Sequence, residues 1–209
     1  MTAHLLACST SECGFSRGAL AVQDLSVAKI FNSRFLNNTV NGFGGAFAVG
    51  NSTVTIKDSK LYNNSANHGR AMYVVQSSVM IVSGSNYSYN SANLSGGVIE
   101  TDQNCQWTVS GSQFIKNRAT TGGVLSAVRR KMYLIDSLFS NNQAIESGGV
   151  IYRIQSEIHF NWSCNLTDNS ASTGGAIFAT ESTLNMYGKM IVESNNARDT
   201  GGGLYLCIP

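Results

Sequence analysis

A pair of glycines returns along this chain at a nearly constant interval. Successive first positions lie 25 to 27 residues apart, so the 209 residues hold about eight repeats. A period of this size indicates an architecture in which each repeat contacts only its neighbours. We expect glycine there because the backbone takes a positive φ or because a Cβ would clash with the next coil. The pairs begin at Gly44, Gly96, Gly122, Gly148, Gly174 and Gly201, with Arg17-Gly18 and Gly69-Arg70 at the two remaining places.

A second mark keeps step with the glycines. An apolar residue is followed three residues later by Asn and five residues later by Ala, as in Phe114, Asn117 and Ala119, and a glycine pair begins five or six residues after that Asn. Stacked repeats would place these amides in one column, where each bonds to the turn of the next coil. We therefore predict a structural Asn ladder, formed by Asn38, Asn64, Asn90, Asn117, Asn142, Asn169 and Asn195.

Each repeat also contains short β-branched segments, such as Thr53–Ile56 and Ser78–Ile81, and an apolar run after the glycines. Two or three such strands cannot bury their own apolar face, but stacking in parallel at about 4.8 Å would bury it. Helical repeats need longer periods, and the leucine spacing of leucine-rich repeats is missing. The sequence therefore predicts an all-β fold, a right-handed single-stranded parallel β-helix of about eight coils with roughly 26 residues each. Residues 1–209 would form one solenoid segment, a piece of a longer protein that lacks its polar caps.

Composition and charge limit the kinds of partner and location expected for this chain. The net charge is +2 and the densest basic run is Arg129-Arg130-Lys131, which is too small for a nucleic-acid surface. No window approaches the roughly 18 apolar residues of a transmembrane helix. Seven Asn-x-Ser/Thr sequons indicate an extracellular or cell-surface location and candidate N-glycosylation. They begin at Asn37, Asn51, Asn63, Asn86, Asn93, Asn161 and Asn165.

An enzyme on this fold would cleave polysaccharides with two carboxylates about 5–9.5 Å apart. Glu100 and Asp102 are the only pair that fits one coil, and solvated surface is the simpler reading of them. Asp58 and Asp136 share a phase but stand three coils apart. The histidines His4, His68 and His159 fall at unrelated phases, so no metal site or catalytic triad can be assembled. We predict no catalytic residue, no metal and no cofactor.

Strand alternation turns one column after the glycine pair outward. Its last three members are Tyr152, Phe178 and Tyr205, which would stack as an exposed aromatic stripe. Such a stripe either reinforces its sheet or recognises a glycan or an apolar patch on a cell-surface protein. These three residues are the candidate binding residues.

The cysteines leave two readings open. Cys8 and Cys13 stand five residues apart in the first coil, where later coils carry Phe and Ala, so they form either a disulfide or two buried thiols. Cys105, Cys164 and Cys207 fall at other phases, and we pair none of them.

The repeat also resembles a known family. Gly174-Gly-Ala-Ile177, together with Phe-x-x-Asn at Phe35, Phe114 and Phe139, is similar to the repeats of the chlamydial polymorphic outer membrane proteins. The resemblance covers residues from about 8 to 206. It implies a surface-exposed β-helix with a role in adhesion, an outer-membrane passenger if the source is bacterial. We expect a structural or adhesive surface segment, with a carbohydrate-binding or carbohydrate-cleaving β-helix as the alternative.

Overall fold

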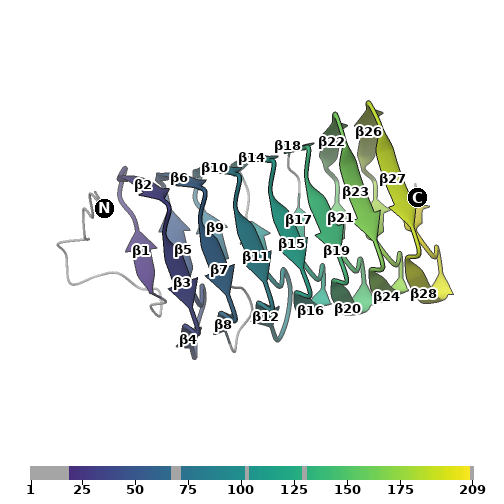
Figure 1. Ribbon diagram of the computed structural model, residues 1–209, viewed down its shortest axis with the longest axis horizontal. Coiled ribbons are helices and arrows are strands. Elements are labelled where there is room, and N and C mark those ends of the chain that lie inside the picture. The colour runs from purple at the N-terminus through teal and green to yellow at the C-terminus, as the bar shows by residue number, and fades with distance from the viewer. Residues whose placement is uncertain (1–18, 67–71, 102–103, 129–130, 208–209) are drawn as a thin grey trace.

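The protein is an all-β parallel solenoid whose coils follow one another along its long axis (Figure 1). The computed structural model describes residues 19–66, 72–101, 104–128 and 131–207. No helix occurs among these residues. The predicted parallel β-helix with a coil of roughly 26 residues is confirmed. One sheet has eight strands and three sheets have seven, so the number of coils is close to the expected eight.

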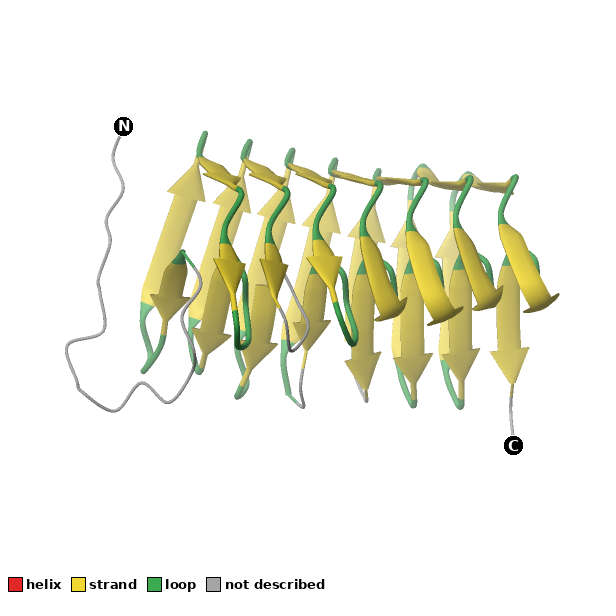
Figure 2. Cartoon of the chain, turned by 90° about the horizontal axis from the view of Figure 1, so that it is seen from below, coloured by secondary structure: helices red, strands yellow, loops and turns green. Residues whose placement is uncertain are grey.

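Four sheets, named A to D, run the length of the solenoid, and the strands of successive coils lie side by side in Figure 2. Sheet A consists of β1 (Leu20–Val22), β5 (Phe47–Gly50), β9 (Met72–Val75), β13 (Ile99–Thr101), β17 (Leu125–Val128), β21 (Ile151–Ile154), β25 (Ile177–Thr180) and β29 (Leu204–Cys207). Sheet B consists of β2 (Val27–Phe31), β6 (Thr53–Lys57), β10 (Val79–Ser83), β14 (Gln106–Ser110), β18 (Lys131–Ile135), β22 (Glu157–Asn161) and β26 (Thr183–Tyr187).

The two remaining sheets hold shorter strands. Sheet C consists of β3 (Arg34–Leu36), β7 (Lys60–Tyr62), β11 (Asn86–Ser88), β15 (Gln113–Ile115), β19 (Leu138–Ser140), β23 (Cys164–Thr167) and β27 (Met190–Glu193). Sheet D consists of β4 (Thr39–Val40), β8 (Ser65–Ala66), β12 (Ser91–Ala92), β16 (Arg118–Thr121), β20 (Gln143–Ser147), β24 (Ser170–Thr173) and β28 (Asn196–Thr200). A full coil therefore has four strands, and the expectation of two or three was too low because the mark around each ladder Asn contains two strands and the turn between them.

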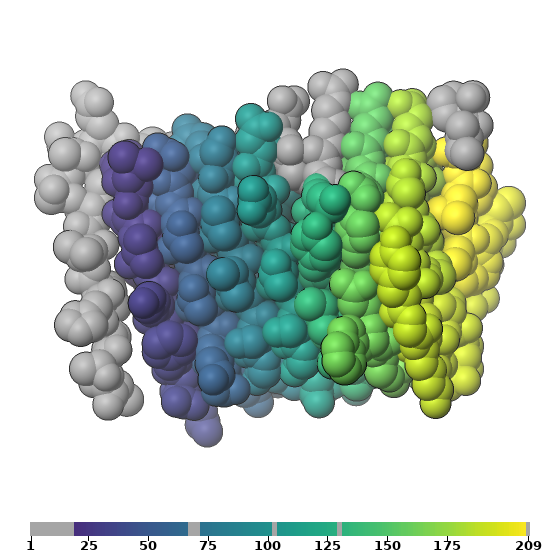
Figure 3. Space-filling model, turned by 90° about the horizontal axis from the view of Figure 1, so that it is seen from above, coloured from purple at the N-terminus to yellow at the C-terminus, as the bar shows by residue number. Residues whose placement is uncertain are grey.

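Neighbouring coils pair in register, which lines up equivalent side chains. Val79–Ser83 pairs residue by residue with Gln106–Ser110, and in the latter strand Trp107 and Val109 are buried while Gln106 is exposed. One face of each strand thus enters a continuous core, as strand alternation requires. The space-filling view shows the same coils as successive bands (Figure 3).

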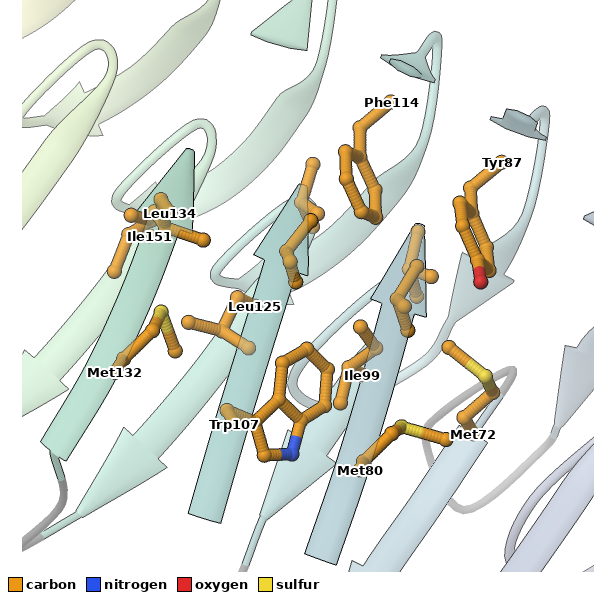
Figure 4. Packing of buried hydrophobic residues seen from close by; sticks show 14 of the residues in the cluster. Met72, Met80, Tyr87, Ile99, Trp107, Phe114, Leu125, Met132, Leu134 and Ile151 are labelled. Carbon is orange, nitrogen blue, oxygen red and sulfur yellow. The ribbon is translucent and has the colours of Figure 1, made fainter. Parts of the chain in front are cut away.

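Aromatic side chains form one column of that core. The rings of Tyr87 and Phe114 stack with centroids 4.8 Å apart, and those of Phe114 and Phe139 stack at 5.0 Å. Trp107 enters the core from sheet B on the opposite side of the same interior (Figure 4). Packing of identical positions on each other makes every coil dependent on the next.

The glycine pair forms the corner before sheet A, and both predicted reasons for glycine are confirmed. The first glycine has a positive φ, which is +67° at Gly148. The second glycine passes close to its neighbour: a Cβ on Gly149 would lie 2.1 Å from the carbonyl oxygen of Gly175. Each member of the pair therefore excludes a side chain for a different reason. The degenerate copies at residues 17–18 and 69–70 lie outside the described residues.

Candidate functional site

The ladder asparagines lie in one column at the turn between sheets C and D. At Asn142 the side-chain Nδ2 donates to Asn169 Oδ1 at 3.0 Å and to the Phe114 carbonyl oxygen at 2.9 Å. Its Oδ1 accepts from the backbone N and the side-chain Nδ2 of Asn117, both at 3.0 Å. Equivalent amide-to-amide bonds join the whole series, which is Asn38, Asn64, Asn90, Asn117, Asn142, Asn169 and Asn195. We propose that this column stabilises the stack of coils.

Two columns of serine accompany the asparagines, and the sequence interpretation missed them. One lies before sheet C, where Ser59 N donates to Ser85 Oγ and Ser85 N donates to Ser112 Oγ, both at 3.1 Å. The other lies before sheet B, where Ser52 N donates to Ser78 Oγ at 3.2 Å. A usable signal was present, because a serine stands two residues before the apolar mark of sheet C in most repeats.

The candidate binding residues come together as expected from their spacing. Tyr152, Phe178 and Tyr205 occupy paired positions on β21, β25 and β29. Their ring centroids lie 5.3 Å and 5.1 Å apart, and the ring planes differ by 11° and 6°. All three side chains are half-buried. Because the stacked rings cover one another's faces, the stripe offers mainly ring edges to the solvent.

Two of the acids that were weighed for catalysis, Asp58 and Asp136, are too far apart to act as a pair. Asp58 and Asp136 occupy the same turn column but stand three coils apart. Glu100 accepts a hydrogen bond from Ser95 Oγ, while Asp102 lies outside the described residues, as do His4 and His68. Within the described ranges, no group of three or more His, Cys, Asp or Glu is placed to hold a metal ion. Nor does this part of the chain contain a helix long and apolar enough to cross a membrane.

A second outward stack lies on sheet B and was not predicted. His159 stacks on Tyr133 at 4.9 Å and faces Tyr187 at 6.2 Å. Glu157 lies beside it, with Oε1 2.7 Å from His159 Nε2 and Oε2 3.3 Å from Lys131 Nζ. Desolvation raises the pKa of the Glu157 carboxyl, but the hydrogen bond and charge of Lys131, together with His159, outweigh it, so that pKa lies below its usual value. Lys131 and Glu157 are directly opposed on β18 and β22, so they form a cross-strand pair of opposite charge.

The sequons follow the turns of the solenoid. Asn37 and Asn63 have positive φ values of 57° and 51°, and each precedes a ladder asparagine. The pattern Asn-Asn-Thr/Ser therefore arises from a left-handed turn residue, a ladder residue and a strand residue, so structure alone accounts for these two sequons. Asn37, Asn51, Asn63 and Asn93 are exposed, whereas Asn86, Asn161 and Asn165 are half-buried.

The structure describes three of the chain's five cysteines. Cys105 and Cys164 are buried and Cys207 is exposed. Cys164 takes the place of a serine in the column before sheet C, and its Sγ lies 3.5 Å from the Leu134 carbonyl oxygen. Cys8 and Cys13, proposed as a disulfide or two thiols, lie outside the described residues.

The fold and its columns define a parallel β-solenoid with polar ladders at its turns. Residues 136–152 match the family model of the Chlamydia polymorphic membrane protein (Chlamydia_PMP) repeat. The predicted resemblance is thereby confirmed for this repeat, which runs from the turn before β19 through the corner at Gly148-Gly149 into β21. No curated protein and no solved structure matches the chain. The repeat and the solenoid fit a surface-exposed structural segment.

Proposed function

We propose that this segment is a rigid adhesive scaffold at a cell surface, and that the stripe of Tyr152, Phe178 and Tyr205 belongs to its binding face. The observation that carries the proposal is the stacking of three partly exposed rings on adjacent coils, at 5.3 Å and 5.1 Å. The ring edges, with the hydroxyl groups of Tyr152 and Tyr205, suit a sugar or an apolar patch of a partner protein. Because every coil fixes the next, the three rings are held in position before any ligand arrives, which lowers the entropic cost of binding.

The competing explanation is that the rings only reinforce sheet A. Cross-strand aromatic pairs stabilise a sheet by roughly 0.2–1 kcal/mol each. A double variant, Tyr152→Ala with Phe178→Ser, separates the two roles. We expect it to stay folded by circular dichroism and to lose adhesion of protein-coated beads to cultured cells.

A matched control is Tyr73→Ala, which removes an outward ring from the same column. Tyr73 lies outside the stripe and stacks on Phe43, with ring centroids 5.1 Å apart. This variant should lose a similar amount of stability and keep adhesion. Full adhesion by the double variant, together with a lowered unfolding midpoint, would show that the stripe is only scaffold.

A further inference from the structure

A second surface feature is an open groove at the turns between sheets B and C in the first coils. The groove of about 360 Å³ is lined by Asn32, Arg34, Asp58, Lys60, Gly84 and Asn86, with two serines. The stripe, in contrast, lies on sheet A in the C-terminal coils. The groove therefore shares no residue with the binding face proposed above.

The groove exists because the turn column changes residue type from coil to coil. Asn32, Asp58 and Gly84 occupy equivalent left-handed positions, with φ values of 47°, 49° and 55°. The first two carry side chains, and the third carries none. A Cβ on Gly84 would lie 2.4 Å from Asp58 Oδ1, so the glycine leaves the carboxylate side of the groove open.

The region around the groove carries mainly positive charge. From Val27 to Ala92, the described residues carry four cations, Lys29, Arg34, Lys57 and Lys60, against one carboxylate, that of Asp58. Asp58 lies 3.9 Å from Lys57 Nζ. Within the described residues, neither Arg34 nor Lys60 forms an ion pair.

Arg34 and Lys60 are also direct neighbours. They pair across β3 and β7, and both side chains are exposed. Like charges directly opposite each other on adjacent strands destabilise a sheet. The Lys60 ammonium lies 5.1 Å from the ring centroid of Tyr62, which does not neutralise its charge. An anion held between the two cations would relieve this repulsion.

The chemistry of the lining selects the kind of anion. Arg34 and Lys60 can bind a sulfate or carboxylate by charge-assisted hydrogen bonds, and the Arg34 guanidinium can do so with two parallel bonds. The Asp58 carboxylate accepts hydrogen bonds from hydroxyl groups, and the exposed Asn32 amide both donates and accepts. A carboxylate in the wall disfavours a polyphosphate backbone, whereas a sugar supplies the hydroxyl groups it needs. We infer that this groove binds an acidic saccharide, through its sulfate or carboxylate groups.

Binding of the full chain to three immobilised probes tests the inference: heparin as a sulfated glycan, polygalacturonate as a carboxylated glycan, and dextran as a neutral glycan. We expect binding to at least one acidic glycan, weakened by added salt, and none to dextran. Which acidic glycan binds more tightly identifies the anionic group. Equal binding to dextran would overturn the inference, as would tighter binding to a short single-stranded RNA than to either acidic glycan.

Variants place the binding in the groove. Arg34→Gln with Lys60→Gln should weaken binding by about tenfold or more, while the charge-preserving Arg34→Lys with Lys60→Arg should keep most of it. Lys189→Gln removes an exposed cation far from the groove and should change binding by less than twofold. If Lys189→Gln loses as much glycan binding as the groove variant, the loss comes from net charge alone, and the proposed site is wrong. Loss of stripe residues should leave glycan binding intact, so this test and that of the adhesive face fail independently.

Discussion

Two corners of each coil solve the same stacking problem in opposite ways. At the turn between sheets C and D, a side chain links neighbouring coils, because each ladder amide bonds to the coils on both sides of it. At the corner before sheet A, a side chain is excluded, because the backbone of the next coil occupies its place. We expect removal of the amide at the first corner to have a moderate cost in stability. The second is defined by a space that cannot be filled, and substitutions there should be worse.

The largest effect should come from Gly149→Ala. The added Cβ would lie 2.1 Å from the Gly175 carbonyl oxygen and 2.8 Å from Ser170 N, so the backbone of two coils must separate. We expect a loss on the order of 4 kcal/mol in the free energy of unfolding, the range of severe core substitutions. Gly202→Ala is the matched control, since it occupies the same column and its Cβ would meet nothing closer than Asn195 O at 3.6 Å. Equal unfolding midpoints in urea for the two variants would contradict the close-approach explanation.

Asn142→Ala tests the opposite corner. It leaves the Phe114 carbonyl oxygen and the backbone N–H of Asn117 without their partners in a buried turn, which should cost about 1–3 kcal/mol. The neighbouring Asn141 is exposed and has a φ of 56°, so Asn141→Gly keeps the backbone conformation and should cost almost nothing. If thermal unfolding gives both variants the same midpoint, the ladder contributes no stability.

The serine columns form a third, weaker kind of corner. Ser85 Oγ accepts from Ser59 N at 3.1 Å and donates to the Ser83 carbonyl oxygen at 2.9 Å. Ser85→Ala should therefore cost about 1 kcal/mol. Ser33 stands at the start of the column, where its Oγ donates to Phe31 O and accepts no bond from the described residues. A smaller cost for Ser33→Ala would show that the bonds between coils stabilise the column, and an equal cost would show that only the local turn matters.

Sequence predicted the two corners because each demands a particular residue type at a fixed interval. Glycine is nearly irreplaceable where a Cβ would clash, and only an amide both donates and accepts across three coils. Serine columns demand less, since cysteine serves at Cys105 and Cys164, and serine is common elsewhere in the chain. The short strands of sheets C and D were also hidden, because a two-residue strand such as Ser65–Ala66 has no alternation to detect.

Side-chain burial was less predictable than strand position. Alternation places Arg153 in the inward column of sheet A, between Ala127 and Ala179, although its charge argues for the surface. In the structure it is fully buried, beside two small residues that leave room for it. The basic groove could not be predicted either, because it depends on how three turn residues of different size project from successive coils. Residues that recur in every repeat thus predict the fold, while surface sites arise where the repeats differ.

The smallest effect should come from Cys164→Ser, which restores serine to its column. At pH 7 we expect its stability to lie within about 0.5 kcal/mol of the parent, as is usual where no cavity, strain or buried charge is created. Burial raises the pKa of the Cys164 thiol, although hydrogen bonds from the backbone N–H groups of Ser137 and Asp136 lower it in part. The folded protein therefore keeps this proton after the unfolded chain has released it near pH 8.5–9, and the parent loses stability as the pH rises above that range. The variant lacks this proton, so its unfolding midpoint should fall less between pH 7 and pH 9.5, by an amount worth less than about 1 kcal/mol. If the unfolding midpoint falls equally for the parent and the variant, burial does not shift the pKa of the Cys164 thiol. The serine column would then tolerate cysteine for its size alone.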